Sequence, residues 1–354
     1  MIRQAISALP VKALAALAIV LGTAVNTPRM AKADEGGVSF WLPGFYGSLA
    51  AVPQQPGWSL PLVYYHTSVS ASGSVGAARE VQIGRFSPTV KLNLDVNVNA
   101  DVDLGIIVPT YVFPSTVFGG QLAVGMMFVT GANHTTLDGT LSASLGPLFA
   151  SRSGSIDSSV TGFGDLFPNA SLRWNSGVNN VMIYMTGNIP VGDYNPNRLA
   201  NLGLGHAAVD GGVGYTYLNP KSGFEASVVT GLTGNFENPD TNYTNGIDWH
   251  TDWGVSQFLS KQFFIGAVGY VYNQITADSG QAAFLGSNMS RVYGVGPQLG
   301  YIFPINEQTQ GYLNLKGYYE FDSTRRPDGW NVWVTFVISP AAAPPPAATA
   351  MRHR

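Results

Sequence analysis

The chain of 354 residues contains no cysteine, and 11% of its residues are charged, against about 25% in a typical soluble domain. The absence of cysteine excludes a disulfide framework, thiol catalysis and cysteine-ligated metal sites. The net charge of −3 leaves no sign of the basic patch that a nucleic-acid partner would need. The hydrophobic fraction, 45%, is nevertheless ordinary. The chain has Gly, Asn, Ser, Thr and aromatic residues where a soluble domain would have charged ones. This composition is typical of a β-barrel, whose strands need an apolar residue only at every second position.

Long apolar runs are also missing from the chain beyond its N-terminus. A membrane-spanning helix needs about 20 apolar residues, so a mature protein that crosses a membrane must cross it as a closed barrel. The N-terminus resembles a secretory signal peptide, with Arg3 and Lys12 before the apolar run 13–25 and an Ala31-Lys32-Ala33 cleavage site. We therefore expect a signal peptide at 1–33. The alternative, a membrane-anchoring helix, requires a longer apolar run.

The segment 90–99 alternates strictly between apolar and polar residues. Its even-numbered positions are Val or Leu, and its odd-numbered positions include Lys91, Asn93, Asp95 and Asn97. A period of two predicts a strand with two different environments. We expect these four polar side chains to line the lumen, either as an electrostatic filter or as a paired, static interior that closes it.

Comparable segments recur along the chain and predict an all-β fold, a transmembrane antiparallel β-barrel spanning 58–339. Fourteen strands are expected, near 58–70, 86–98, 102–112, 120–130, 135–145, 165–175, 180–189, 206–218, 223–235, 247–259, 262–273, 290–303, 310–321 and 330–338. Short and long connections alternate between them, except at 113–119. The weakest of these segments is 135–145, and its loss would favour twelve strands, because bacterial barrels use even numbers.

Near the C-terminus the alternation in 312–321 predicts two faces, one with Asn314, Lys316, Tyr318 and Glu320 and the other with Leu313, Leu315, Tyr319 and Phe321. Lys316 and Glu320 are predicted to line the lumen. The loop that follows carries four charged residues, which form either a salt-bridged outer mouth or a solvated turn: Asp322, Arg325, Arg326 and Asp328. Residues 340–354 form a Pro/Ala tail that is expected to be disordered or extended.

The segment 34–57 lacks strand alternation but holds four aromatic residues, Phe40, Trp41, Phe45 and Tyr46. We expect it to be a plug that fills the lumen and offers an aromatic surface to an apolar ligand. The alternative is an extended lead-in that packs against the periplasmic rim.

Several loop motifs occur in a characteristic order: Gly44-Phe45-Tyr46-Gly47-Ser48, Gly162-Phe163-Gly164-Asp165-Leu166, Pro190-Val191-Gly192-Asp193-Tyr194, Arg198-Leu199-Ala200-Asn201-Leu202-Gly203, Asn235-Phe236-Glu237-Asn238, Asp278-Ser279-Gly280, Gly296-Pro297-Gln298, and Tyr319-Glu320-Phe321-Asp322 followed by Arg326-Pro327-Asp328-Gly329-Trp330. Together they resemble the family named for the MetA pathway of phenol degradation. Those proteins are outer-membrane transporters, broadly similar to fatty-acid and toluene uptake channels. The resemblance covers nearly the whole mature chain. It implies a barrel in the outer membrane, linked to uptake of aromatic or other apolar compounds.

Other functions leave weaker signals. The chain has no G-x-S-x-G or H-E-x-x-H motif, so the sequence indicates no enzyme. A barrel-embedded lipid hydrolase, which would need a Ser–His–acid cluster on the outer wall, or a purely structural barrel is the alternative. A general diffusion porin would need about sixteen strands, and a soluble β-sandwich would carry charged outer faces. The acidic run Glu237, Asp240, Asp248 and Asp252 lacks the spacing of a calcium loop.

We therefore expect a channel for passive uptake of small hydrophobic or aromatic compounds, with no cofactor and no metal. Its location would be the outer membrane of a Gram-negative bacterium, after cleavage of the signal peptide. The expected partners are outer-membrane lipid, the outer-membrane assembly machinery and a small hydrophobic or aromatic ligand, without nucleic acid.

Overall fold

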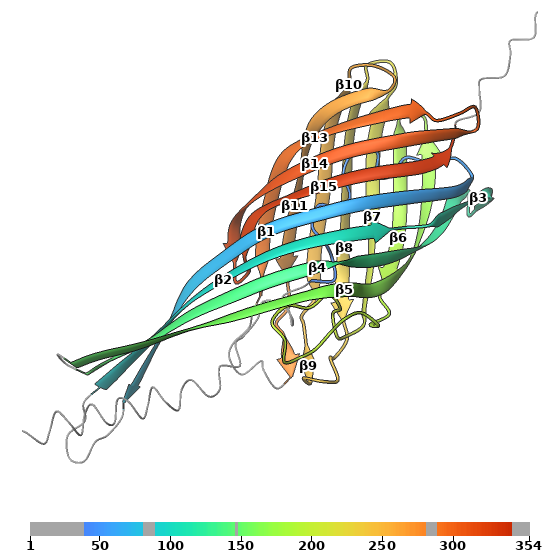
Figure 1. The fold of residues 1–354 in the computed structure, drawn as a ribbon. Coiled ribbons are helices and arrows are strands. Elements are labelled where there is room, and N and C mark those ends of the chain that lie inside the picture. The colour runs from blue at the N-terminus through green and yellow to red at the C-terminus, as the bar shows by residue number, and fades with distance from the viewer. Residues whose placement is uncertain (1–38, 81–88, 146–147, 281–288, 342–354) are drawn as a thin grey trace, which may run out of the picture.

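The computed structural model describes residues 39–80, 89–145, 148–280 and 289–341. Within these ranges twelve antiparallel strands form a closed barrel, in which each strand pairs with its neighbours and β15 closes onto β1 (Figure 1). The strands are β1 (Gly57–Glu80), β2 (Thr89–Ile107), β4 (Gly120–Leu145), β5 (Leu148–Ser176), β6 (Asn179–Gly187), β7 (Ala208–Asn219), β8 (Phe224–Asn235), β10 (Asp248–Phe258), β11 (Phe263–Gln274), β13 (Arg291–Pro304), β14 (Thr309–Thr324) and β15 (Asp328–Pro340). No helix in the described ranges is long and apolar enough to cross a membrane.

Three short strands complete the structure. β3 (Thr110–Val117) forms a hairpin with β4 and also pairs with the first residues of β1. β9 (Tyr243–Thr244) and β12 (Ser279–Gly280) join two loops at the opposite end of the barrel. The connection that broke the predicted alternation of short and long loops, 113–119, is therefore part of the β3–β4 hairpin.

The favoured count of fourteen strands is wrong, and the alternative of twelve is correct. The predicted turns at 99–101 and 131–134 lie inside strands β2 and β4, where each residue keeps its cross-strand partner. Their Asn, Asp and Gly residues resemble turn residues. The apolar parity of β2 nevertheless continues unbroken through the first of these sites, in Val98, Ala100 and Val102. Two pairs of predicted strands thus merge into two long strands.

In several strands the alternation places polar and aromatic side chains inside the barrel and aliphatic ones outside, whereas β2 turns the aliphatic Leu104 and Ile106 inward. In β14, Asn314, Lys316, Tyr318 and Glu320 are buried, while the intervening Leu313, Leu315, Tyr319 and Phe321 are exposed, which confirms the predicted faces. The exposed face of β8 is likewise apolar, with Val228 and Leu232. An apolar outer wall around a polar interior is the pattern of a barrel in a lipid bilayer.

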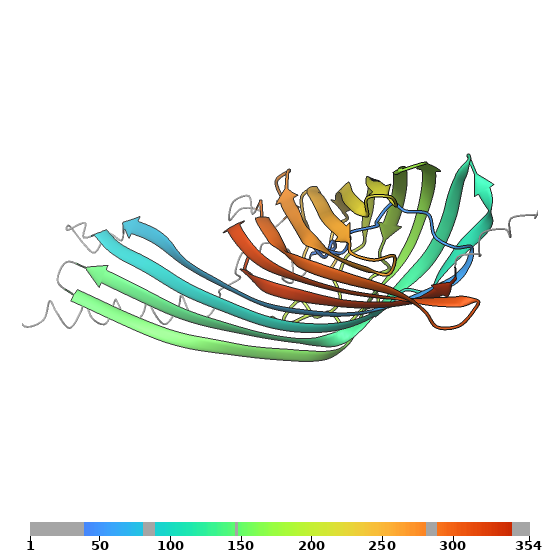
Figure 2. The same ribbon diagram turned by 90° about the horizontal axis from the view of Figure 1, so that it is seen from above.

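Strands β1, β2, β4 and β5 continue far beyond the closed barrel (Figures 1 and 2). β1 pairs with β15 only up to Ser70, and β5 pairs with β6 only from Asn169 onward. The pairing of β1 with β2 and of β4 with β5 continues to the tips of the strands. We call this protruding four-stranded sheet, residues 71–80, 89–99, 136–145 and 148–157, the extension. It replaces much of the predicted loops 71–85 and 146–164.

The extension lies at the same end of the barrel as the long connections 188–207, 236–247 and 275–290, while the other end carries short connections such as 177–178 and 220–223. Bacterial barrels place short turns in the periplasm and long loops outside the cell. The extension lies at the end that corresponds to the outer side of such barrels. The predicted signal peptide (1–33), residues 34–38 of the predicted plug and residues 342–354 of the predicted tail lie outside the described residues.

Candidate functional site

Residues 39–56, which precede β1, run through the barrel interior without regular secondary structure; we call them the inner segment. Their contacts are with inward-facing side chains from many strands around the wall. Phe40 and Trp41 are among the buried residues of the interior cluster, with exposures of 8% and 5%. The aromatic residues that the sequence analysis singled out therefore lie within the barrel and not at its periplasmic rim.

The centre of the inner segment is held between a cation and an anion. Lys316 of β14 donates from Nζ to the carbonyl oxygens of Gly44, Phe45 and Tyr46 at 2.6, 3.0 and 3.3 Å. Asp252 of β10 accepts the backbone N–H groups of Gly44 and Tyr46 at 2.9 and 3.0 Å. We call Lys316 and Asp252 the clamp. Charge-assisted hydrogen bonds are shorter and about twice as strong as neutral ones, so the clamp fixes the backbone of residues 44–46.

Gly44 is required by this geometry. Its φ of +86° lies in the left-handed region, and a Cβ at this position would stand 2.9 Å from the ring of Tyr318. Only glycine combines that conformation with the close approach to the barrel wall.

Further along the inner segment, polar side chains of the wall bind successive backbone groups. Glu225 of β8 accepts the N–H of Leu49 at 2.9 Å, and Thr216 of β7 accepts the N–H of Ala51 at 3.0 Å. Since a buried backbone N–H without a partner is costly, these two side chains fix the path of the inner segment across the barrel.

The serine at position 48 adds a side-chain anchor. Gln298 of β13 donates to its hydroxyl at 2.6 Å, and that hydroxyl also shares a hydrogen bond with Ser256 of β10, again at 2.6 Å. The polar contacts of residues 44–51 thus come from β7, β8, β10, β13 and β14, on one side of the barrel. Beyond them, Gln54 exchanges two hydrogen bonds with Gln121 of β4, at 2.7 and 2.6 Å.

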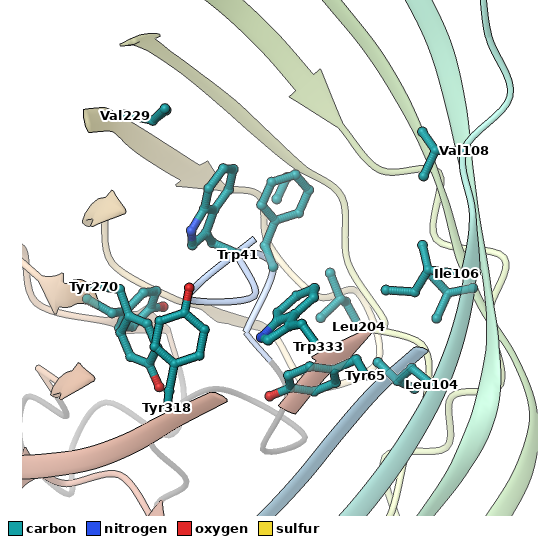
Figure 3. Packing of buried hydrophobic residues seen from close by; sticks show 14 of the residues in the cluster. Trp41, Tyr65, Leu104, Ile106, Val108, Leu204, Val229, Tyr270, Tyr318 and Trp333 are labelled. Carbon is teal, nitrogen blue, oxygen red and sulfur yellow. The ribbon is translucent and has the colours of Figure 1, made fainter. Parts of the chain in front are cut away.

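The aromatic side chains of the inner segment pack on rings of the wall. Figure 3 shows Trp41 in the interior cluster together with the wall residues Trp333, Tyr270 and Tyr318. Trp41 stacks on His250, with ring centroids 3.7 Å apart and an interplanar angle of 16°. Phe45 contacts Trp333 edge-on at 6.1 Å. Burial raises the pKa of Tyr46 to about 12, so this phenol remains neutral at physiological pH.

The stacked pair carries polar atoms of its own. His250 Nε2 lies 2.8 Å from Asp210 Oδ2, whereas His250 Nδ1 and Trp41 Nε1 are buried without a hydrogen-bond partner among the described residues. Buried polar atoms of this kind are rare in proteins. The interior therefore combines flat apolar surface with hydrogen-bonding positions that a hydroxyl group could satisfy.

The structure places the other predicted interior and loop residues as follows. Glu320 is buried and accepts a hydrogen bond from Tyr270 at 2.5 Å. Asp322 pairs with Arg291 at 3.1 Å, and Arg326 donates to Ser39 of the inner segment at 3.1 Å. Since β14 and β15 extend further than predicted, the loop itself is only three residues long, 325–327. Asp328 begins β15 and accepts a hydrogen bond from Ser323 at 2.9 Å, and Arg325 adopts a positive φ of 53° in the tight turn.

The polar positions predicted in β2 lie elsewhere than expected. Lys91, Asn93, Asp95 and Asn97 pair with β1 residues beyond Ser70, so they belong to the extension and not to the closed barrel. The exposed Asp95 and Asn97 are at odd-numbered positions of β2, like the outward-facing Asp103, so they lie on the same face of the strand. The period of two was correct, but the buried Leu104 and Ile106 show that the apolar face, and not the polar one, turns inward.

Of the side chains that hold the inner segment, Lys316 was predicted to line the lumen, and the others were missed by sequence reasoning. Asp252 had been grouped with Asp248 and two loop residues as an acidic run, Gln298 appeared only within a family motif, and Glu225 and Thr216 were not singled out. The available signal was alternation: Asp248, His250, Asp252 and Ser256 share one face of β10, opposite Trp249, Trp253 and Val255. On β10 the polar face of this alternation is the one that lines the lumen, whereas on β2 the apolar face is the inward one.

One cluster bears on the enzyme alternative. On the outward face of β4 and β5, His134 Nδ1 lies 2.7 Å from Ser159 Oγ and 3.7 Å from Asp157. A catalytic triad requires the acid and the serine at different ring nitrogens, whereas here both approach the same one. For metal binding, no group of three or more His, Asp or Glu side chains in the described part of the chain could hold an ion.

Comparison with known proteins gives one family. The model of the family described as “Putative MetA-pathway of phenol degradation” matches residues 63–336, which confirms the resemblance found in the sequence. No curated protein matches the chain. Among solved structures, an outer membrane channel from Pseudomonas putida F1 is similar over 84% of this chain and 99% of its own, with 15% identity and a TM-score of 0.49. A FadL homologue from Pseudomonas aeruginosa is similar over 88% and 97%, with 9% identity and a TM-score of 0.40.

Proposed function

Because this chain belongs to the MetA-pathway family of phenol degradation, whose model covers nearly the whole barrel, we propose that it is an outer-membrane channel for passive uptake of small hydrophobic or aromatic compounds. The inner segment is its plug. The observation that carries the proposal is the seating of four aromatic residues inside the barrel, held to the wall by the clamp.

The mechanism follows from the two kinds of contact. The clamp holds residues 44–46 in place, so they restrict the bore at that level. The rings of Trp41 and Phe45 offer flat apolar surface to an entering compound, which would exchange ring contacts with Trp41, His250 and Trp333. Transport by this route needs no energy source, since only packing and hydrogen bonds within the lumen change.

Hydroxylated aromatic compounds would gain a hydrogen bond that hydrocarbons cannot make. The free positions are Trp41 Nε1 and His250 Nδ1. A general diffusion porin is the alternative function, but a porin keeps a water-filled channel, and here an aromatic segment occupies the interior.

Single-channel conductance in planar bilayers tests the proposal. We compare the wild-type protein with a variant lacking residues 39–56, each with and without phenol and toluene. The wild type is expected to show small openings that the aromatic compounds modulate. The deletion variant should show larger openings that they do not modulate, while heat-modifiable migration on gels confirms a folded barrel. Equal conductance and equal modulation in both proteins would contradict the plug. Large openings in the wild type that no aromatic compound modulates would favour a general porin.

A further inference from the structure

The extension has two chemically different faces. Register places Ala71, Val98, Leu137 and Ile156 in one row across its four strands, and Ser70, Asn99, Thr136 and Asp157 in the adjacent row. Neighbouring positions along a strand point to opposite faces. One face is therefore apolar, and the other is polar.

The polar face continues for several rows. Asp95, Asn97, Asp138, Ser153 and Ser155 belong to it, and all five are exposed. A sheet embedded in lipid would carry aliphatic residues on this side, as the barrel wall does. The polar face therefore indicates that the extension stands in water or among sugar headgroups, outside the hydrocarbon of the membrane.

The apolar face is continuous with the inner wall of the barrel. Along β2 it runs from Val98 through Ala100 and Val102 to Leu104 and Ile106, which are buried inside the barrel (Figure 3). Exposure rises in the outward direction, and Ile156, at the end of the apolar row, is 52% exposed. On β4 and β5 the base of the same face includes the polar Asn133, Thr135 and Ser158, but along β2 it contains only apolar side chains. An apolar molecule could thus follow β2 from this face into the barrel.

The connection between β6 and β7 covers only the base of this face. Asn133 donates to the carbonyl of Asn201 at 2.9 Å, and Ser158 accepts the N–H of Ala200 at 3.1 Å. On the same face, the next cross-strand pair outward from Ser158 is Leu137 and Ile156, and the pair after it is Gly139 and Gly154. A Cβ added at either glycine would meet nothing within 4 Å, so the backbone there is open to contact.

From this two-faced sheet, its continuity with the lumen and its partial cover, we infer that the apolar face of the extension is a binding surface for small apolar molecules. We call the row of Ala71, Val98, Leu137 and Ile156, with the adjoining glycines, the capture surface. It would collect solute at the cell exterior and pass it to the interior wall. This inference rests on the proposed function, because it supplies the first binding step of the same route.

Photolabelling tests the capture surface directly. The probe is 3-trifluoromethyl-3-phenyldiazirine, a small apolar aromatic compound, applied to the purified full-length protein in lipid nanodiscs with and without excess toluene. Labelled positions are mapped by mass spectrometry. We expect labelling of peptides that contain Val98 and Ile156, and we expect toluene to suppress it. Lipid-facing positions such as Leu232 provide the reference that toluene competition at a specific site should leave unchanged.

Two variants with a matched control sharpen the test. The paired substitutions Leu137→Ser and Ile156→Ser should weaken capture about tenfold, as expected when roughly 60 Å² of apolar contact is lost. The control pair Thr136→Ser and Asp157→Ser lies one position away on the polar face and should change nothing. Gly139→Leu provides an independent variant, which should block the surface by bulk alone.

Three outcomes would overturn the capture surface: labelling that toluene does not suppress, labelling equal in Gly139→Leu and wild type, or labelling that falls as protein concentration rises. The last result would show that a second copy of the chain covers the face. If any of these outcomes is found while aromatic compounds still modulate the conductance, the capture surface is refuted but the proposed channel function is not. Intact labelling combined with equal conductance in wild type and the variant lacking residues 39–56 would refute the plug alone.

Discussion

Substitution of Lys316 by Met gives the most informative perturbation of the clamp. The ammonium group donates to three carbonyl oxygens of the inner segment, two of them within 3.0 Å, and lies 5.0 Å from the ring of Trp333. Hydrogen bonds to charged groups contribute about 1.5–3 kcal/mol each, but the bonds of one ammonium group are not additive. A loss of about 3 kcal/mol for the set is consistent with the cost of breaking a buried charged interaction.

That loss corresponds to a roughly 10²-fold increase in the fraction of molecules whose inner segment is released. Hydrogen exchange measured by mass spectrometry reports it, because the amides of Gly44 and Tyr46 are bonded to Asp252 only while the segment is seated. We expect exchange in the peptide containing residues 42–47 to rise by about that factor, and bilayer recordings to show more frequent large openings.

Lys221→Met serves as the matched control, since Lys221 is exposed in the short turn between β7 and β8. It should change neither exchange nor conductance. Asp252→Asn should act in the same direction as Lys316→Met, and the double variant should lose less than the sum, because both residues hold the same three-residue backbone. Unchanged exchange at Gly44 and Tyr46 in Lys316→Met would refute the reasoning.

Three further predictions follow from other parts of the barrel. Trp41→Ala removes the ring stacked on His250 and should raise both the conductance and the hydrogen exchange of the inner segment. The control Trp58→Ala, at a residue 68% exposed at the start of β1, should change neither. Equal effects of the two substitutions would contradict the role of the stack. Val228→Arg, on the exposed face of β8, should lower the free energy of unfolding in lipid vesicles by about 2–4 kcal/mol. Ser155→Arg on the extension should change that free energy by less than about 0.5 kcal/mol. Urea titration measures both values, and similar losses would argue against the assigned membrane span. Ser159→Ala should leave the hydrolysis of p-nitrophenyl esters at the level of the wild type, because His134 approaches Ser159 and Asp157 through one nitrogen; an esterase activity that disappears in this variant would reopen the enzyme alternative.

Much of the barrel could be predicted from the sequence because alternation directly encodes the two faces of a strand. The faces of β14 were correct residue by residue, and Lys316 was placed in the interior. Strand ends were less accessible, since Asn, Asp and Gly also occur within strands. At Asn99 and Gly131 these residues are paired in mid-strand, where local turn propensity is overridden by the ladder on both sides.

The direction of a face could not be derived from alternation alone. A polar parity lines the lumen in a water-filled barrel, but in the extension the same polarity faces outward, as at Asp95 and Asn97. Polar residues can face outward only where the strand has left the bilayer. The position at which a strand leaves the bilayer depends in turn on the lengths of the neighbouring strands. The partners of the inner segment could not be derived from local patterns either. Asp252 is separated from Gly44 by 208 positions in the chain, and Glu225 is separated from Leu49 by 176 positions.

The central claim is that the protein admits small aromatic compounds through the outer membrane. The most direct test is the initial rate of entry of radiolabelled toluene into bacterial cells that lack the protein, compared with the same cells producing the wild-type chain. Faster entry is expected with the wild type, and no saturable aromatic entry is expected with the variant lacking residues 39–56, at matched amounts of the two folded barrels in the outer membrane. Equal rates in cells with and without the wild-type protein would contradict the proposed uptake.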